Sequence, residues 1–161
     1  MTIQIEKTTS SRLATLDFSA IEFGNVFSDH LFRQEWKDGT WQDPTIIPHQ
    51  SIALSPAALG LHYGQVVFEG LKAYRGTHDN VIRLFRPDRN AKRLQESCER
   101  LCIPTVTTDD FLDAVSALAS LEQDWVPPSR LQTLYLRPIL FGSEGHLACL
   151  LYTSPRPRDR G

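Results

Sequence analysis

The sequence has little of several features that define protein classes by themselves. Only three of its 161 residues are cysteines, and an odd, small number argues against a disulfide framework. The 17 Lys and Arg residues nearly balance the 19 Asp and Glu residues, so composition gives no general attraction to nucleic acid or to an anionic membrane. No apolar run approaches the roughly 20 residues of a membrane-spanning helix. The opening residues also lack the basic-then-apolar order of a secretory signal.

The remaining composition is that of an ordinary globular protein. Hydrophobic residues make up 41% and charged residues 22% of the chain, which excludes the disordered and fibrous classes. The length suits one domain with a hydrophobic core and is short for two. We expect an intracellular protein in the cytoplasm, with mitochondria as an alternative if the source is eukaryotic.

The chain divides by composition into three parts. Residues 1–22, rich in Ser and Thr, are expected to form a flexible lead-in, with regular structure beginning near Phe23. Residues 23–144 alternate strand and helix patterns that predict an α+β domain, with a mainly antiparallel sheet and flanking helices. Residues 145–161 change abruptly to Pro, Arg and Ser. We expect this tail to be disordered or foreign to the preceding domain.

Local signals predict the elements of the domain. Lys37 to Gly39 supply turn chemistry, and Pro48 restricts the short strand over 46–48 to a sheet edge. Thr107 with Asp110 resembles a capping box at the start of a helix. The expected helices cover 57–69, 88–102 and a segment from about 108, and the expected strands cover 23–36, 46–48, 71–76, 81–86 and 129–142.

The strand around Tyr135 carries the most informative polar pattern. Alternation places Tyr135 and Arg137 on one face, with apolar neighbours on the other. A guanidinium and a phenol two residues apart suit recognition of a carboxylate. The alternative is an edge strand whose outer face is simply exposed to water, and exposed Arg is the commoner case.

Other candidates each have a structural alternative. Tyr63 and Phe68 lie among glycines that allow close backbone approach, yet aromatics at helical spacing are usually core residues. Arg93 projects away from the apolar stripe of its helix, so it faces either solvent or a ligand. Cys98 and Cys102 stand at i and i+4, but no His pair completes a metal site, and apolar packing is favoured. No serine-hydrolase, P-loop, zinc-protease or dinucleotide fingerprint occurs.

Longer residue strings resemble a known family. FGNVFSDH, LHYGQVVFEGLKAYRG, IRLFRPDRNAKRL, DWVP and LYLRPILFGSE, in this order, are similar to the N-terminal part of branched-chain amino acid aminotransferases. These are class IV transaminases that depend on pyridoxal 5'-phosphate. The resemblance covers about residues 23–144. Its most specific part is the combination of LHYGQVVFEGLKAYRG with LYLRP.

The resemblance implies a role for six residues. Arg93 matches the arginine that grips the cofactor phosphate, and Arg137 matches the one that orients the pocket tyrosine and receives the distal carboxylate of glutamate. Four aromatic residues match the wall of the pocket for the branched side chain: Phe23, Tyr63, Phe68 and Tyr135. The Tyr63 position serves the partner subunit's site in the family, which implies a homodimer. No nucleic-acid or membrane partner is implied.

The family reaction moves an amino group from leucine, isoleucine or valine to 2-oxoglutarate, and its Schiff-base lysine lies in a large C-terminal domain. None of Lys37, Lys72 or Lys92 stands at a matching position, so we assign no catalytic residue here. We expect an incomplete transaminase that is inactive alone. Two alternatives stay open: another class IV enzyme (a D-amino acid transaminase or an aminodeoxychorismate lyase), or a non-catalytic fragment that acts as an interaction module.

Overall fold

Two long helices pack together behind the main sheet. The structure, a computed structural model, describes residues 1–129 and 131–146. Helix α2 (Pro87–Arg100) buries Ala91, Leu94 and Cys98, and α3 (Thr108–Leu121) buries Phe111, Val115 and Ala119. These residues recur at helical spacing, which gives each helix an apolar stripe toward the core. The capping prediction is confirmed, because the Thr107 hydroxyl accepts a hydrogen bond from the Asp110 backbone N–H at 3.1 Å.

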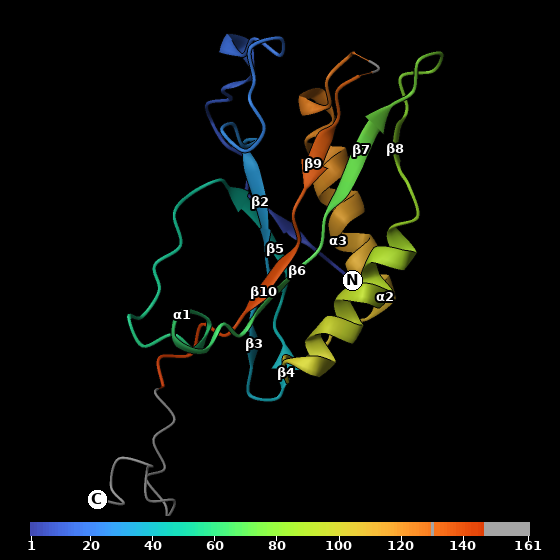
Figure 1. The fold of residues 1–161 in the computed structure, drawn as a ribbon. Helices are drawn as coiled ribbons and strands as arrows, with labels where there is room; N and C mark the ends of the chain where they lie inside the picture. The colour runs from blue at the N-terminus through green and yellow to red at the C-terminus, as the bar shows by residue number, and fades with distance from the viewer. Residues whose placement is uncertain (130, 147–161) are drawn as a thin grey trace, which may run out of the picture.

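The main sheet is antiparallel and consists of two short sheets, which the hydrogen bond from the Glu69 N–H to the Pro138 carbonyl at 2.9 Å connects; we call the two together the bent sheet. Strand β7 (Leu71–Arg75) pairs with β8 (Ile82–Leu84) and β9 (Leu134–Leu136), which confirms the strands predicted over 71–76 and 81–86. Strand β6 (Val66–Phe68), directly before β7, pairs with β10 (Ile139–Phe141), directly after β9. The predicted strand over 129–142 is therefore two short strands with a break at Arg137–Pro138. Figure 1 shows the two bent strands side by side, with α3 behind them and α2 beside them at the lower right.

A second sheet lies beside the first. Its order is β1 (Gln4–Ile5), β5 (Thr45–Pro48) and β2 (His30–Arg33), with β1 parallel and β2 antiparallel to β5. Strands β3 (Trp36–Lys37) and β4 (Thr40–Trp41) form a hairpin. Its turn is the predicted one, since Asp38 and Gly39 have φ angles of 52° and 79°. Two 3-10 turns cover Leu13–Thr15 and Gln123–Trp125.

Several local predictions were wrong. Of the strand expected over 23–36, only His30–Arg33 forms a strand (β2), and Trp36 begins β3. The helix expected over 57–69 is only α1 (Leu59–Tyr63); it ends at Gly64, whose φ is 63°, and the β-branched Val66 and Val67 then pair with β10. The segment with Pro48 is the central strand of its sheet, because β1 pairs with its other side. Regular structure also begins before Phe23, with β1.

The architecture confirms the predicted α+β class. One core cluster combines residues of α2, α3 and the bent sheet, including Val67, Leu71 and Leu136. No helix within residues 1–129 and 131–146 is long and apolar enough to cross a bilayer. The flexibility of the lead-in and the proposed boundary at 144 stay predictions. Most of the predicted tail, 147–161, lies outside the described residues.

Candidate functional site

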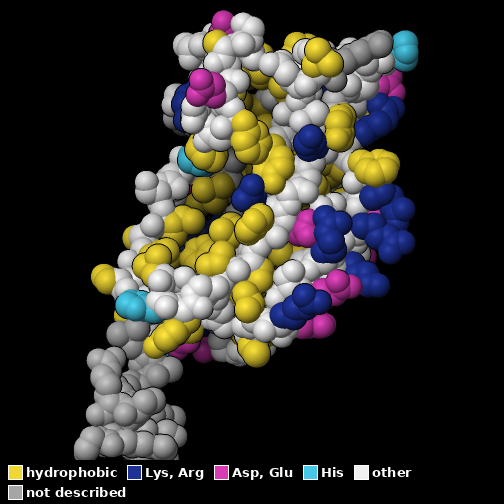
Figure 2. Space-filling view, viewed as in Figure 1, with side chains coloured by type: hydrophobic (Ala, Val, Ile, Leu, Met, Phe, Trp, Pro, Cys, Tyr) yellow, Lys and Arg dark blue, Asp and Glu magenta, His cyan; other side chains and the backbone are white. Residues whose placement is uncertain are grey.

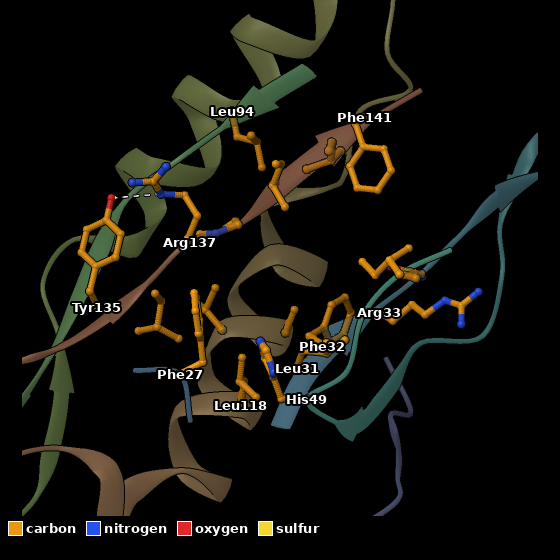
Figure 3. Close-up of a pocket in the computed structure, with 18 of the residues that line it drawn as sticks. Phe27, Leu31, Phe32, Arg33, His49, Leu94, Leu118, Tyr135, Arg137 and Phe141 are labelled. Carbon is orange, nitrogen blue, oxygen red and sulfur yellow. Dashed lines mark hydrogen bonds between the residues drawn. The ribbon is translucent and has the colours of Figure 1, made fainter. Parts of the chain in front are cut away.

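The break between β9 and β10 turns an arginine over two aromatic rings. The Arg137 guanidinium carbon lies 4.5 Å from the ring centroid of Phe68 and 5.1 Å from that of Tyr135. Arg137 Nε also donates a hydrogen bond of 3.2 Å to the Tyr135 hydroxyl (Figure 3). The cation is thus oriented by a phenol and two π faces, while its remaining N–H groups stay available to an anion.

Glycine at position 70 is required for this arrangement. A Cβ atom built on Gly70 would collide with the Tyr135 hydroxyl. The phenol therefore lies directly over the backbone between β6 and β7. The sequence-based expectation that glycine here permits close approach is confirmed at Gly70.

A loop from the N-terminal part of the chain completes the aromatic wall. The Phe23 ring meets Tyr135 edge-on, with centroids 5.2 Å apart and ring planes at 76°. Such edge-to-face pairs are favoured by the ring quadrupoles. Phe23 is 78% exposed and Phe68 is 58% exposed, so both rings present large apolar surfaces outward instead of filling the core.

Behind this wall, Arg93 makes a two-point ion pair with Glu69. Arg93 Nε and Nη2 donate to the two carboxylate oxygens at 3.0 and 2.7 Å, and Asn90 Nδ2 adds a third bond of 2.7 Å. The carboxylate is 9% exposed, whereas the Arg93 side chain is 57% exposed. Burial opposes ionisation of Glu69, but the hydrogen bonds from Arg93 and Asn90 outweigh it and lower the pKa of this carboxyl below its ordinary value.

Glu69 and Asn90 were missed by the sequence reasoning. Glu69 follows the apolar run of β6, and Asn90 lies beside Ala91 on the buried side of α2. A polar residue in an apolar run or on an apolar helix face is costly to bury unless it is paired. That signal was present in the sequence, but the partner could not be read from it.

Phe23, Tyr135 and Arg137 also line a wide apolar cleft between β9 and β10 on one side and β2 on the other, whereas Phe68 is not among its lining residues. Leu31 and Phe32 line it from β2, Leu118 from α3 and Phe141 from β10 (Figure 3). Its volume of about 1600 Å³ exceeds the roughly 300–1,000 Å³ of typical small-molecule pockets. Figure 2 shows hydrophobic side chains gathered along this hollow and charged ones along the face near α2.

The structure brings together four of the six predicted site residues: Phe23, Phe68, Tyr135 and Arg137. Arg93 joins them indirectly, because its partner Glu69 follows Phe68 in the chain. Tyr63 lies apart on α1, where it is 62% exposed and its ring is 6.2 Å from that of His62. Cys98 is buried and Cys102 exposed, and burial raises the pKa of the Cys98 thiol.

Comparison with known proteins gives a consistent result. No family model matches the chain. It is 42% identical over 147 residues to branched-chain-amino-acid aminotransferase 2 of Bacillus subtilis, covering 91% of this chain and 40% of that protein. It is 39% identical over 152 residues to the mitochondrial branched-chain-amino-acid aminotransferase of Mus musculus, covering 94% of this chain and 38% of that protein.

The fold is found in solved structures of the same kind. The branched-chain aminotransferase of the thermophilic archaeon Thermoproteus uzoniensis, solved with norvaline, matches with a TM-score of 0.53 over 75% of this chain and 37% of that one. A second branched-chain amino acid aminotransferase, complexed with N-(5'-phosphopyridoxyl)-L-glutamate, matches with a TM-score of 0.53 over 74% of this chain and 35% of that one. At 21% and 22% identity, these likenesses show the fold alone.

The fold is thus that of the N-terminal, α+β portion of an aminotransferase. The chain belongs to the branched-chain-amino-acid aminotransferase family, and it spans about two-fifths of the length of the curated relatives that it matches.

Proposed function

We propose that this chain is the substrate-binding portion of a branched-chain-amino-acid transaminase, which transfers the amino group of leucine, isoleucine or valine to 2-oxoglutarate. The observation that carries the proposal is Arg137, held by Tyr135 and Phe68 at the edge of an exposed aromatic wall. One site thereby offers both an apolar surface and a fixed cation. The two amino-acid substrates, branched and acidic, need these two features in turn.

The aromatic wall would bind the aliphatic side chain. Burying a leucine side chain contributes about 1.5–3 kcal/mol, and Phe23 and Phe68 have exposed ring area for this contact. Arg137 would receive the distal carboxylate of glutamate or 2-oxoglutarate. A hydrogen bond to a charged group contributes about 1.5–3 kcal/mol, so the two binding modes are of comparable strength.

Arg93 fits the phosphate of pyridoxal 5'-phosphate by its donor set. Two of its N–H groups are engaged with Glu69, which leaves others on an exposed guanidinium that is fixed in orientation. Glu69 would act as the positioning residue for this contact. When bound, the cofactor supplies the electron sink for the bond broken at the substrate Cα.

The exposed Tyr63 supports a homodimer in which this side chain reaches the partner's pocket. On this proposal Tyr63, which is exposed and lies on α1, contacts the substrate in the partner's pocket. Phe23, Phe68 and Tyr135 would form the rest of each wall. No residue of this chain is assigned as catalytic, and we propose that the chain alone does not catalyse transamination. The proposed location is the cytoplasm.

The test expresses the longest open reading frame of the source DNA that contains this chain, called the longer protein below, with the purified 161-residue chain as its control. Glutamate formation from leucine and 2-oxoglutarate is measured with added pyridoxal 5'-phosphate. We expect activity on leucine, isoleucine and valine for the longer protein and none for the chain. A longer protein that uses D-alanine, or cleaves aminodeoxychorismate, but not leucine would overturn the substrate assignment. A longer protein without any such activity that co-elutes with an intact aminotransferase would favour an interaction module instead.

A further inference from the structure

A buried carboxylate closes the loop that carries Phe23. Asp29, 8% exposed, lies directly before β2. Its side-chain oxygens accept hydrogen bonds from the Ser11 hydroxyl at 2.5 Å and from the Arg12 backbone N–H at 3.1 Å. Residues 13–28 therefore form a surface loop, as in Ω-loops. Its two ends are joined by the Asp29 carboxylate and also by the Arg12 guanidinium, which donates to the Phe27 and Ser28 carbonyls at 2.9 and 3.1 Å.

The joined ends are also fixed to the core. Trp125 Nε1 donates to Asp29 at 3.1 Å, and the Asp29 backbone N–H donates to the Glu122 carboxylate at 2.9 Å. Both partners lie after α3, and Glu122 is 2% exposed. Burial opposes ionisation of Asp29, but its hydrogen bonds, that from Ser11 foremost, outweigh burial and lower the pKa of this carboxyl. A buried anion that accepts three bonds from two segments fixes those segments relative to its own.

Outside its closed ends, the loop is held by few contacts. Gln132 Nε2 donates to the Phe18 carbonyl at 2.7 Å, and the Phe27 ring stacks on His49 with centroids 4.9 Å apart. Phe23 itself is mostly exposed and contacts the wall through Tyr135. The position of this ring therefore depends on where the ends of the loop are anchored.

We propose that Asp29 is a positioning residue: its carboxylate ties the two ends of loop 13–28 and thereby holds the Phe23 ring against Tyr135 in the substrate pocket. The inference rests on the proposed function, because the pocket that Asp29 would shape is the one proposed to bind the branched side chain. The contact that it controls is measurable without cofactor or turnover.

The test labels the tyrosines of the full chain with 3-fluorotyrosine and follows Tyr135 by fluorine NMR. The chain has four tyrosines, and Tyr135→Phe identifies the signal. Phe23→Leu removes the neighbouring ring and sets the shift expected when the edge-to-face contact is lost. Asp29→Asn places an N–H group either where Ser11 and Trp125 both donate or where the Arg12 N–H donates. We expect it to move the Tyr135 signal by more than half of the Phe23→Leu shift and in the same direction.

Two further variants make the result specific. Asp17→Asn is the matched control, because Asp17 lies in the same loop but bonds only locally, to the Ser19 N–H at 2.9 Å and hydroxyl at 2.7 Å. It should leave the signal in place. Asp29→Asn added to Phe23→Leu should give no further shift. Ser11→Ala removes one donor to Asp29 and should give a smaller shift of the Tyr135 signal in the same direction. Amide exchange in α2 shows whether Asp29→Asn still folds. If it does not, the proposal is tested with Ser11→Ala, and an unshifted Tyr135 signal in that variant overturns it.

The proposal is overturned if Asp29→Asn leaves α2 protected and the Tyr135 signal at its wild-type position. It is equally overturned if Phe23→Leu moves nothing, or if Asp29→Asn shifts the signal in the absence of the Phe23 ring. None of these outcomes bears on transamination, whereas an inactive longer protein would contradict the proposed function and leave the loop contact standing.

Discussion

Replacing Glu69 with glutamine should destabilise the chain in a way that depends on pH. The substitution keeps one oxygen. At the Oε2 position this oxygen still accepts from Asn90 and from Arg93 Nη2, and the amide N–H group then faces Arg93 Nε. The lost bond is charge-assisted and ends on a buried carboxylate, but the arginine is more than half exposed and therefore partly screened by water. We expect the free energy of unfolding at pH 7 to fall by about 1–2 kcal/mol in total. This loss combines the missing hydrogen bond with the unfavourable contact between the amide N–H group and Arg93.

The pH dependence follows from the lowered pKa of Glu69. A carboxyl whose pKa is lower in the folded than in the unfolded chain stabilises the fold above its unfolded value, about 4.3. That stabilisation is lost as the pH falls through the folded value. The difference between wild type and Glu69→Gln should therefore be constant from neutral pH down to about pH 5 and shrink at more acid pH.

Urea unfolding followed by tryptophan fluorescence measures both effects. Asp79→Asn is the matched control, because Asp79 pairs with Arg83 at the exposed β7–β8 turn, where an ion pair contributes little. It should cost clearly less than Glu69→Gln at pH 7. Equal stabilities of wild type and Glu69→Gln at pH 7, or a difference that stays the same down to pH 3, would refute the role assigned to the buried pair.

Three further predictions concern the site in the longer protein. Arg137→Lys should raise the KM for 2-oxoglutarate by about tenfold or more, because lysine lacks the planar guanidinium that can donate to Tyr135 and to a carboxylate at the same time. An unchanged KM would contradict the role of Arg137. Phe68→Ala should raise the KM for leucine by about tenfold with less effect on 2-oxoglutarate, as steady-state kinetics would show; equal effects would count against the aliphatic wall. Arg93→Ala should weaken pyridoxal 5'-phosphate binding at least about tenfold in equilibrium dialysis, and unaltered binding would remove Arg93 from the phosphate site.

The local elements of the fold were largely predictable from sequence. Helical periodicity and the Thr107 cap gave α2 and α3 because each depends on residues a few positions apart. The β7–β8 hairpin and the Asp38–Gly39 turn are local in the same way. The helix expected over 57–69 failed because Val66 and Val67 pair with β10, which lies far along the chain.

The site was predictable in its residues but not in its geometry. Alternation put Tyr135 and Arg137 on one face, yet the break at Pro138, which turns Arg137 over Phe68, depends on pairing between distant strands. The role of Glu69 as the partner of Arg93 depends on the packing of α2 against the bend. Resemblance supplied the roles that spacing left open, and those roles stay proposals.

The most direct measurement is a crystal structure of the longer protein with pyridoxal 5'-phosphate and bound leucine. We predict that the leucine side chain lies within ~4.5 Å of the Phe68 and Tyr135 rings, on the side that Phe23 closes. Leucine bound elsewhere, with Arg137 and these rings covered by other parts of the protein, would contradict the central claim.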